Sequence, residues 1–321
     1  DRQMQQEFDY LQEAANLETM RGVLLPEFED RVALPEVIRD LTSERMLTMT
    51  FLEGEGLDKA FRARVASTGV DASKVLKLMS TDGEEVAREA EAQGFEAAGG
   101  VGVGGGSAAL PAESSSTGAS APDYGKVVDT LLDVYGYCVL ARGVYNADPH
   151  PGNVLVMPDG RLGLVDFGQV ARLHEESRAA LADVIVGVIS GDRAKAVDAW
   201  NRIGIVYTSA DPGLASEDIA WHEVLWLWGK LAIIPFPKHI KTAQAVSDNT
   251  TDLPAVGRTV LILRGVALAF GCWVSLAEAW LPWAAASPQE AERLRAAARA
   301  LEGKNLSGAW TMTHQTTGQE V

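Results

Sequence analysis

The sequence predicts an α+β protein in which a short mixed segment precedes a mainly helical block. Three observations support this class. Apolar residues at helical spacing open the chain and are followed by short β-compatible runs, a two-strand hairpin pattern lies near the middle, and helical patterns fill the rest. The 321 residues, of which 47% are hydrophobic, can build a sizeable core. This composition excludes a wholly disordered chain, a collagen and a coiled coil.

The first elements are a helix and a strand. Residues 1–21 place apolar side chains at helical spacing among Glu, Asp and Gln, which predicts an amphipathic helix with no capping residue ahead of it. Residues 46–52 predict a β-strand, and residues 53–56 the turn that follows it. Because the chain begins at Asp1 in the middle of the helical pattern, we expect a fragment or a processed chain.

Residues 80–122 differ in composition from both neighbouring segments. Six of the eight residues at 99–106 are glycine, and serine and alanine are frequent around them. Such a segment buries too little apolar surface to offset the entropy lost when it is ordered. We therefore expect a disordered Gly/Ser/Ala-rich insertion at 80–122, and a flexible polar tail at 304–321.

The second half of the chain predicts a helix, a hairpin and a helical block. Residues 124–143 carry apolar side chains on one helical face, which predicts a buried amphipathic helix. Residues 154–156 and 162–165 predict two strands joined by a turn at 157–160. The pattern from 175 to 303 is mainly helical. Breaks in it are predicted at Gly191, at 211–213, at Pro235 and Pro237, and at Pro254.

Two apolar features of the helical block are predicted to belong to the core. The longest apolar run, 265–277, is too short to span a bilayer, and a buried helix is the better interpretation. Trp221, Trp226 and Trp228 make an aromatic-rich helix, for which core packing is favoured over contact with a lipid surface. Cys138, on the helix at 124–143, is likewise expected to be a core residue rather than a nucleophile.

Charge and cysteine content limit the partners and the compartment. Lys and Arg number 28 against 44 Asp and Glu, so the net charge is −16. Such a chain repels phosphate backbones, which excludes nucleic acid as a general partner, and an anionic substrate needs a metal or a local positive site. The chain has 2 cysteines, too few for a disulfide framework or a Cys-ligated zinc site, and this indicates a reducing compartment.

The residues that carry chemistry lie around the predicted hairpin. Phosphoryl transfer needs hard oxygen ligands for Mg²⁺ and a carboxylate beside the attacking oxygen. In protein kinases a loop Asp precedes a metal-binding Asn by five residues, and a second Asp opens an Asp-Phe-Gly turn. Asp148 and Asn153 have this spacing, and Asp166-Phe167-Gly168 follows the hairpin, whose two ends lie together. We therefore interpret Asp148 as base or orienting carboxylate, and Asn153 and Asp166 as metal ligands. His150, between two prolines, is expected to orient the loop rather than bind metal.

With these motifs the chain resembles the UbiB-type (aarF-domain) atypical kinases. The resemblance runs from residue 1 to about residue 285 and is interrupted by the insertion. The segments that carry it are Asp148-Pro149-His150-Pro151-Gly152-Asn153, Asp166-Phe167-Gly168, the Glu-x-Asp-like helix at 7–16, the strand-like runs at 34–37 and 47–54, and Leu263-Arg264-Gly265. It implies a protein-kinase-like fold with a partial N-terminal lobe and hinge region at 1–79 and a mainly helical C-terminal lobe at 123–303.

The resemblance also implies a function. The family binds ATP with Mg²⁺ and acts as an atypical kinase or ATPase in isoprenoid-quinone or prenyl-lipid metabolism. A prenyl lipid or quinone precursor and a membrane surface are then the expected partners. A plastid, a mitochondrion or the bacterial cytoplasm is the expected location. The cofactor-binding residues implied are Glu7, Asp9, Glu13, His150, Phe167 and Gly168.

Two roles implied by the resemblance depend on lysines. Glu13 would pair with the nucleotide-binding lysine, and Glu7 with a lysine of an N-terminal Lys-x-Gly-Gln element. Both lysines, and the loop that covers the phosphates, are expected upstream of Glu7, so this chain alone is expected to lack full catalytic competence. The family usually has His two residues before the loop Asp, where this chain has Asn146.

Two other functions stay open at this point. One is a small-molecule phosphotransferase of the aminoglycoside or choline kinase type, which shares a similar loop and turn. Those enzymes usually show His-Gly-Asp ahead of the loop, which Asn146-Ala147-Asp148 does not match. The other is a nucleotide-sensing pseudokinase scaffold, which Asn146 keeps open.

Overall fold

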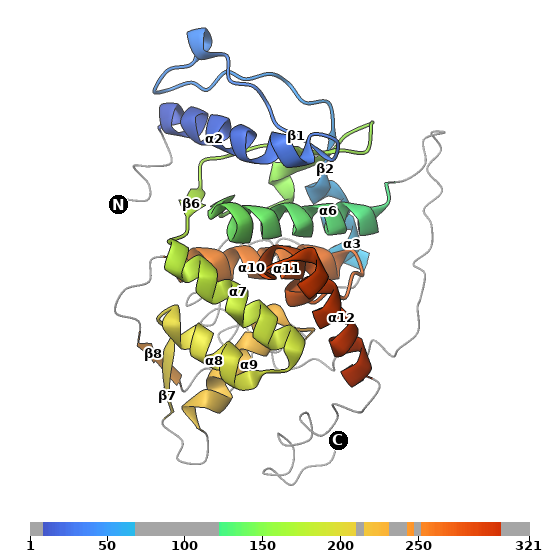
Figure 1. Ribbon diagram of the computed structural model, residues 1–321. Coiled ribbons are helices and arrows are strands. Elements are labelled where there is room, and N and C mark those ends of the chain that lie inside the picture. The colour runs from blue at the N-terminus through green and yellow to red at the C-terminus, as the bar shows by residue number, and fades with distance from the viewer. Residues whose placement is uncertain (1–8, 68–121, 210–214, 231–242, 247–251, 303–321) are drawn as a thin grey trace.

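The computed structural model of the 321-residue chain describes residues 9–67, 122–209, 215–230, 243–246 and 252–302 (Figure 1). The longer helices are α2 (Tyr10–Phe28), α3 (Leu57–Ser67), α6 (Tyr124–Gly136), α7 (Glu175–Ser190), α8 (Arg193–Arg202), α9 (Ser216–Trp228), α10 (Asp252–Ala269), α11 (Leu276–Ala284) and α12 (Pro288–Glu302). Short helical turns are η1 (Arg39–Leu41), η2 (Tyr137–Arg142) and η3 (Pro151–Asn153). The strands are β1 (Val32–Ala33), β2 (Glu55–Gly56), β3 (Val144–Asn146), β4 (Val154–Val156), β5 (Leu162–Leu164), β6 (Val170–Arg172), β7 (Val206–Ser209) and β8 (Ala243–Val246). The predicted α+β class is confirmed.

Two small sheets bring the loop motifs together. In the first, β1, β5, β4 and β2 lie side by side in that order, and β4 and β5 form the predicted antiparallel hairpin. In the second, β3 pairs antiparallel with β6, so that Asn146 lies opposite Val170. The β3–β6 pair therefore joins the segment before the loop to the segment just after Asp166-Phe167-Gly168.

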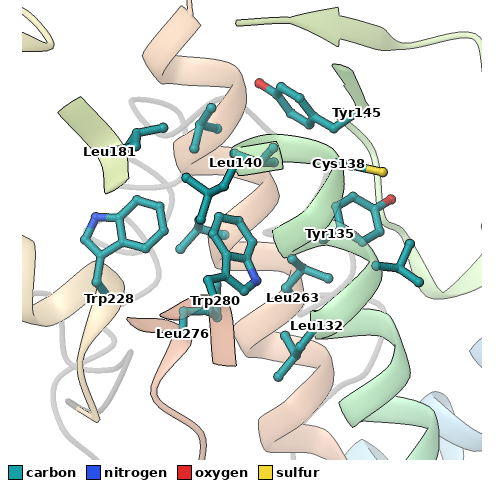
Figure 2. Packing of buried hydrophobic residues seen from close by; sticks show 14 of the residues in the cluster. Leu132, Tyr135, Cys138, Leu140, Tyr145, Leu181, Trp228, Leu263, Leu276 and Trp280 are labelled. Atoms are coloured by element: carbon teal, nitrogen blue, oxygen red, sulfur yellow. The ribbon is translucent and has the colours of Figure 1, made fainter. Parts of the chain in front are cut away.

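The core is centred on α6, α10 and α11. Figure 1 shows α6 between the upper part, with α2 and the first sheet, and the helical block below. Figure 2 shows side chains from η2, α9 and α11 meeting there. Trp228 and Trp280 are 1% and 0% exposed and their rings meet edge to face at 5.5 Å. Core packing of Trp226 and Trp228 is confirmed, as is the burial of the free Cys138.

The helix predicted at 124–143 is confirmed, with a change of spacing inside it. Asp123 caps α6 by accepting the N–H of Lys126. After Gly136 the helix continues as η2, a π-helical turn that ends at Gly143 in the left-handed region, with φ of +64°. The N–H of Gly143 donates to the carbonyl of Cys138, five residues back, which is the π-helical spacing.

The first predicted helix is confirmed over residues 10–21, and residues 1–8 lie outside the described residues. α2 runs from Tyr10 to Phe28, and Asp9 caps it by accepting the N–H groups of Leu11 and Gln12. The prediction that this helix lacks a capping residue was therefore wrong. An Asp in the middle of an acidic amphipathic pattern is easily taken for one more exposed helical residue.

The strand predicted at 46–52 is not formed. That segment has only isolated bridges, Ser43 with Met46 and Val37 with Met49, and the predicted turn at 53–56 instead contains β2, which pairs with β4. Phe51 is 86% exposed, so the largest apolar side chain of the segment is not buried as it would be in a core strand. A strand is also stabilised by pairing with a neighbouring strand over several consecutive residues, and this segment has only isolated bridges.

Two predictions in the helical block were wrong. The run at 265–277 is not one helix: α10 ends at Ala269, and α11 starts at Leu276, with Gly271 at φ of +75° between them. Pro254 does not break a helix, because it lies in the first turn of α10, where no N–H is needed. The break at Gly191 is confirmed, since Gly191 caps α7 in the left-handed region.

Other predictions lie outside the described residues. These predictions concern nearly all of the insertion at 80–122, the tail at 304–321, Glu7, and the breaks at 211–213 and 235–237. The division into an N-terminal lobe at 1–79 and a C-terminal lobe at 123–303 stays a prediction. Of the helices that the structure describes, none has the length and apolar character needed to cross a membrane.

Candidate functional site

The loop between β3 and β4 carries Asp148 and is shaped by short-range hydrogen bonds. The backbone N–H of Ala147 donates to the carbonyl of Gln169 at 2.7 Å, which continues the β3–β6 pairing. Further on, His150 Nδ1 accepts the N–H of Gly152 at 3.1 Å, at the start of η3. The imidazole of His150 therefore holds the turn that leads to Asn153, in line with the orienting role expected for it.

Asn146 connects the loop to the Asp-Phe-Gly turn. Its Nδ2 donates to the carbonyl of Asp166 at 2.8 Å, and its Oδ1 accepts the N–H of Asp148 at 3.0 Å. The residue is 7% exposed, so both bonds are shielded from water. One amide group thus fixes the distance between the backbones of the two acidic residues. An amide carries both a donor and an acceptor in the plane of one group, which suits this bridge.

Asp166 lies in the left-handed region of backbone conformation, which is uncommon for a residue other than glycine. Its φ is +65°, and it is the only non-glycine residue with positive φ in the part of the chain that the structure describes. Asp tolerates this region better than most residues, but it is still strained, and such strain gathers at functional sites. Asp166 is exposed and its Oδ1 accepts the N–H of Gly168 at 3.2 Å, while Phe167 is buried at 2%. The buried Phe167 side chain therefore fixes the turn in the core, while the Asp166 carboxylate is exposed to solvent.

Asn153 lies at the other end of the β4–β5 hairpin. Its carbonyl accepts the N–H of Val165 at 3.0 Å, and its Nδ2 donates to the carbonyl of Asp148 at 3.3 Å. Because Nδ2 faces the loop, Oδ1 is the atom of this side chain that can coordinate a cation. The hairpin thus brings Asn153 next to the residue before Asp166, as predicted.

α2 contributes two side chains to the same turn. Asn16 Nδ2 donates to the carbonyl of Phe167 at 2.8 Å. The backbone of Phe167 also lies close enough to the Glu13 carboxylate to lower its pKa in part. Glu13 is partly buried, and burial raises its pKa, with a further rise from the neighbouring Asp166 carboxylate. No Lys or Arg among the described residues forms an ion pair with Glu13 that could offset the repulsion from Asp166.

α10 reaches the loop from more than 100 residues further along the chain. Thr259 Oγ1 donates to the carbonyl of Ala147 at 3.2 Å. Arg258 Nη2 lies 3.6 Å from Asp148 Oδ1, and its Nη1 donates to Gln169 Oε1 at 3.2 Å. The sequence prediction missed both residues. The available signal was a pair of arginines, Arg258 and Arg264, in a mainly apolar helix, which is unusual because a charge removed from water needs a partner.

The oxygen atoms at the hairpin ends suit a magnesium ion. The described residues hold no group of three or more His, Cys, Asp and Glu that could bind a metal on its own. Mg²⁺ does not require one, because it usually takes one or two protein carboxylates and completes its shell with water and substrate phosphates. The Asp166 carboxylate and Asn153 Oδ1 are hard donors of this kind.

The predicted site residues fall into three groups. Glu13, Asp148, Asn153, Asp166, Phe167 and Gly168 are joined by the contacts above, with His150 at the edge of the loop. Asp9 lies at the start of α2, where it caps the helix. Glu7 is outside the described residues.

Comparison with known proteins agrees with this arrangement. The family model described as the ABC1 atypical kinase-like domain matches residues 1–89 and 113–200, which together are more than half of the chain. The stretch left out, 90–112, lies inside the predicted insertion.

Individual relatives align over shorter stretches. The chain is 26% identical over 187 residues to the protein ACTIVITY OF BC1 COMPLEX KINASE 3, chloroplastic, of Arabidopsis thaliana, an alignment that covers 58% of this chain and 18% of that protein. It is 42% identical over 68 residues to an uncharacterized protein of Synechocystis, covering 21% of this chain and 17% of that one. The chain thus spans less than a fifth of the length of these curated relatives.

A search of solved structures gives a more distant likeness. The complex of Rv3197 with erythromycin from Mycobacterium tuberculosis aligns with a TM-score of 0.46 and 15% identity, over 81% of this chain and 55% of that one. The family model is the stronger finding, because its match includes both the loop and the Asp-Phe-Gly turn. The chain belongs to the ABC1 (UbiB/aarF-type) atypical kinase-like family.

Proposed function

We propose that this chain is the phosphoryl-transfer module of an atypical kinase or ATPase that uses ATP and Mg²⁺. The observation that supports it best is the bridge made by Asn146, which links the backbones of Asp148 and Asp166 through two hydrogen bonds. Phosphoryl transfer depends on positioning and electrostatics more than on covalent chemistry by the protein. A buried link between the two acidic residues supplies such positioning.

The proposed roles follow the geometry of each side chain. Asp166 and Asn153 hold Mg²⁺ through hard oxygen atoms. Asp148 orients the acceptor hydroxyl or water and takes its proton as the new P–O bond forms and the bond to the leaving diphosphate breaks. When bound, Mg·ATP supplies the phosphoryl group. Glu13 meets the nucleotide-binding lysine that the family resemblance implies, and a cation there offsets its repulsion with Asp166.

The acceptor that we propose is a prenyl lipid or quinone precursor at a membrane surface, or water. This finer assignment rests on the family resemblance. The relatives include proteins named as chloroplastic in Arabidopsis and proteins of Synechocystis, which supports a plastid or a bacterial cytoplasm as the setting. The family match also supports this type of kinase over the aminoglycoside or choline kinase type.

Calorimetric titration of the full natural protein with Mg·ATP tests the proposal. Asp166→Asn keeps the side-chain shape but removes the charge of a proposed ligand, and we expect it to weaken Mg²⁺-dependent ATP binding by about tenfold or more. The matched control is Asp159→Asn, an exposed carboxylate at the opposite end of the same hairpin that pairs with Arg161.

Each outcome of this titration has a clear meaning. Equal binding by wild type and Asp166→Asn would remove Asp166 as a ligand. A wild type that binds no ATP would reject the proposed function. Binding without turnover of ATP would favour the nucleotide-sensing pseudokinase scaffold.

A further inference from the structure

Arg258 occupies a place in the site that neither the family resemblance nor the proposed roles explain. It comes from α10, while Asp148 and Gln169 come from the loop and from the segment after Asp166-Phe167-Gly168. Its guanidinium lies between them, with Nη2 3.6 Å from Asp148 Oδ1 and Nη1 donating to Gln169 Oε1 at 3.2 Å. One side chain thus contacts both halves of the proposed site.

The pair with Asp148 differs from the ion pairs on the molecular surface. The side chains of Arg258 and Asp148 are 26% and 24% exposed. The atoms Arg258 Nε and Asp148 Oδ1 are buried and have no hydrogen-bond partner among the residues that the structure describes. The exposed pair of Arg202 with Asp183, on α8 and α7, is 47% and 38% exposed. At a given separation, a partly buried pair of charges is screened less by water than an exposed pair.

The anchoring of α10 fixes where this charge lies. Thr259, the next residue, donates to the carbonyl of Ala147 at 3.2 Å and is fully buried. The carbonyl of Gln169 accepts the N–H of the same Ala147. Loop, α10 and the segment after the turn therefore meet at one point, directly beside Asp148.

We propose that Arg258 is a positioning residue, which holds the Asp148 carboxylate in its working orientation and ties it to the segment after the Asp-Phe-Gly turn. This inference rests on the proposed function. A planar guanidinium can address two acceptors at once, whereas an ammonium group is a single point charge. Arg258→Lys should therefore keep the attraction to Asp148 but lose the link to Gln169.

The test measures ATP turnover by the full natural protein and three variants, Arg258→Gln, Arg258→Lys and Asp148→Asn, with the double variant Arg258→Gln/Asp148→Asn. We expect Arg258→Gln to lower kcat by about 10- to 100-fold while KM for ATP changes by less than about threefold, because the nucleotide is held elsewhere. Arg258→Lys should recover part of kcat. In the Asp148→Asn background, Arg258→Gln should change kcat by less than about twofold, since the residue that it positions is already gone.

Control and contrary outcomes separate this role from a structural one. Arg202→Gln, which also breaks an ion pair, should leave kcat unchanged. If Arg258 were purely structural, Arg258→Gln would lower Tm, and the two single effects on kcat would multiply in the double variant. Either that result or an unchanged kcat in Arg258→Gln overturns the proposal.

A wild type that binds or turns over no ATP would instead reject the proposed function. The coupling is then measured from the Tm of the wild type, Arg258→Gln, Asp148→Asn and the double variant. A loss in the double variant smaller than the sum of the single losses supports the coupling of Arg258 to Asp148, and a loss equal to the sum overturns it.

Discussion

The helical block and the site loop are held together by different forces. Around α6 and α11, large apolar side chains such as Trp280 are fully buried and meet ring to ring. Around Asp148 and Asp166, the contacts are hydrogen bonds between side chains and backbone, made by residues such as Asn146 and Asn16. Burial is insensitive to small shifts in direction, whereas hydrogen bonds are not. We therefore expect the helical block to contribute most of the free energy of unfolding, and the hydrogen bonds of the loop to fix the positions of Asp148 and Asp166.

The largest expected effect lies in the block. Trp280 is 0% exposed, and its ring packs against Gly136, where an added Cβ would lie 2.8 Å from Trp280 Cδ1. Trp280→Ala should lower the free energy of unfolding by about 3–5 kcal/mol, because it removes a large buried ring and leaves a cavity. Urea denaturation measures this. Trp273→Ala, at a tryptophan that is 53% exposed, should change it by less than about 0.5 kcal/mol. Similar losses for both would contradict a core centred on α11.

A smaller effect on stability but a larger one on turnover is expected in the loop. Asn146→Leu keeps the volume but leaves the N–H of Asp148 and the carbonyl of Asp166 without their partner. We expect the free energy of unfolding to fall by about 1–3 kcal/mol. We also expect kcat to fall tenfold or more, because a shift of about 1 Å in the Asp148 or Asp166 backbone would misplace the reacting groups. Asn146→His keeps a hydrogen-bond donor, so its free energy of unfolding and its kcat should lie between those of the wild type and of Asn146→Leu. Wild-type turnover by Asn146→Leu would show that the bridge does not position the site.

The smallest expected effect concerns pH. Burial raises the pKa of Glu223 on α9 to about 7, and its Oε2 has no hydrogen-bond partner in the described part of the chain. The folded state binds the proton of the Glu223 carboxyl more tightly than the unfolded state does. The stability that this protonation contributes is therefore present below about pH 4.5 and is lost as pH rises through about 7. The free energy of unfolding should fall by on the order of 1–3 kcal/mol between pH 5 and pH 8.

Urea denaturation at the two pH values checks this dependence. Glu223→Gln should flatten most of it, while some slope remains because the pKa of Glu13 is also raised. Glu217→Gln, at an exposed position of the same helix, should leave the slope as it is. An unchanged slope in Glu223→Gln would assign the effect to another group.

Local signals predicted the elements around the hairpin. The hairpin of β4 and β5 follows from a tight turn between two short apolar runs, and the proximity of Asn153 to the Asp-Phe-Gly turn follows from the hairpin. α6 follows from its apolar face. In each case the information lies within about 15 residues, which is the range over which periodicity and turn chemistry act.

What the sequence did not predict depends on distant contacts. β1 pairs with β5 and β3 with β6 across long separations, and two- or three-residue strands have no pattern of their own. Arg258 reaches Asp148 only because α10 folds back across the loop. The run at 265–277 is split around Gly271, whose φ is +75°, and a hydrophobic run alone does not reveal such a break.

The π-helical turn η2 makes the site dependent on chain length. Between Gly136 and Gly143 the helix takes up one more residue per hydrogen-bonded turn than an α-helix would. Removing a single residue there would restore α-helical spacing, leave the apolar face of α6 in place and rotate everything beyond it by about 100°. β3 and Asn146 would then no longer face the Asp-Phe-Gly turn. Deletions and insertions in this turn are therefore expected to be less tolerated than substitutions, even though none of its side chains belongs to the proposed site.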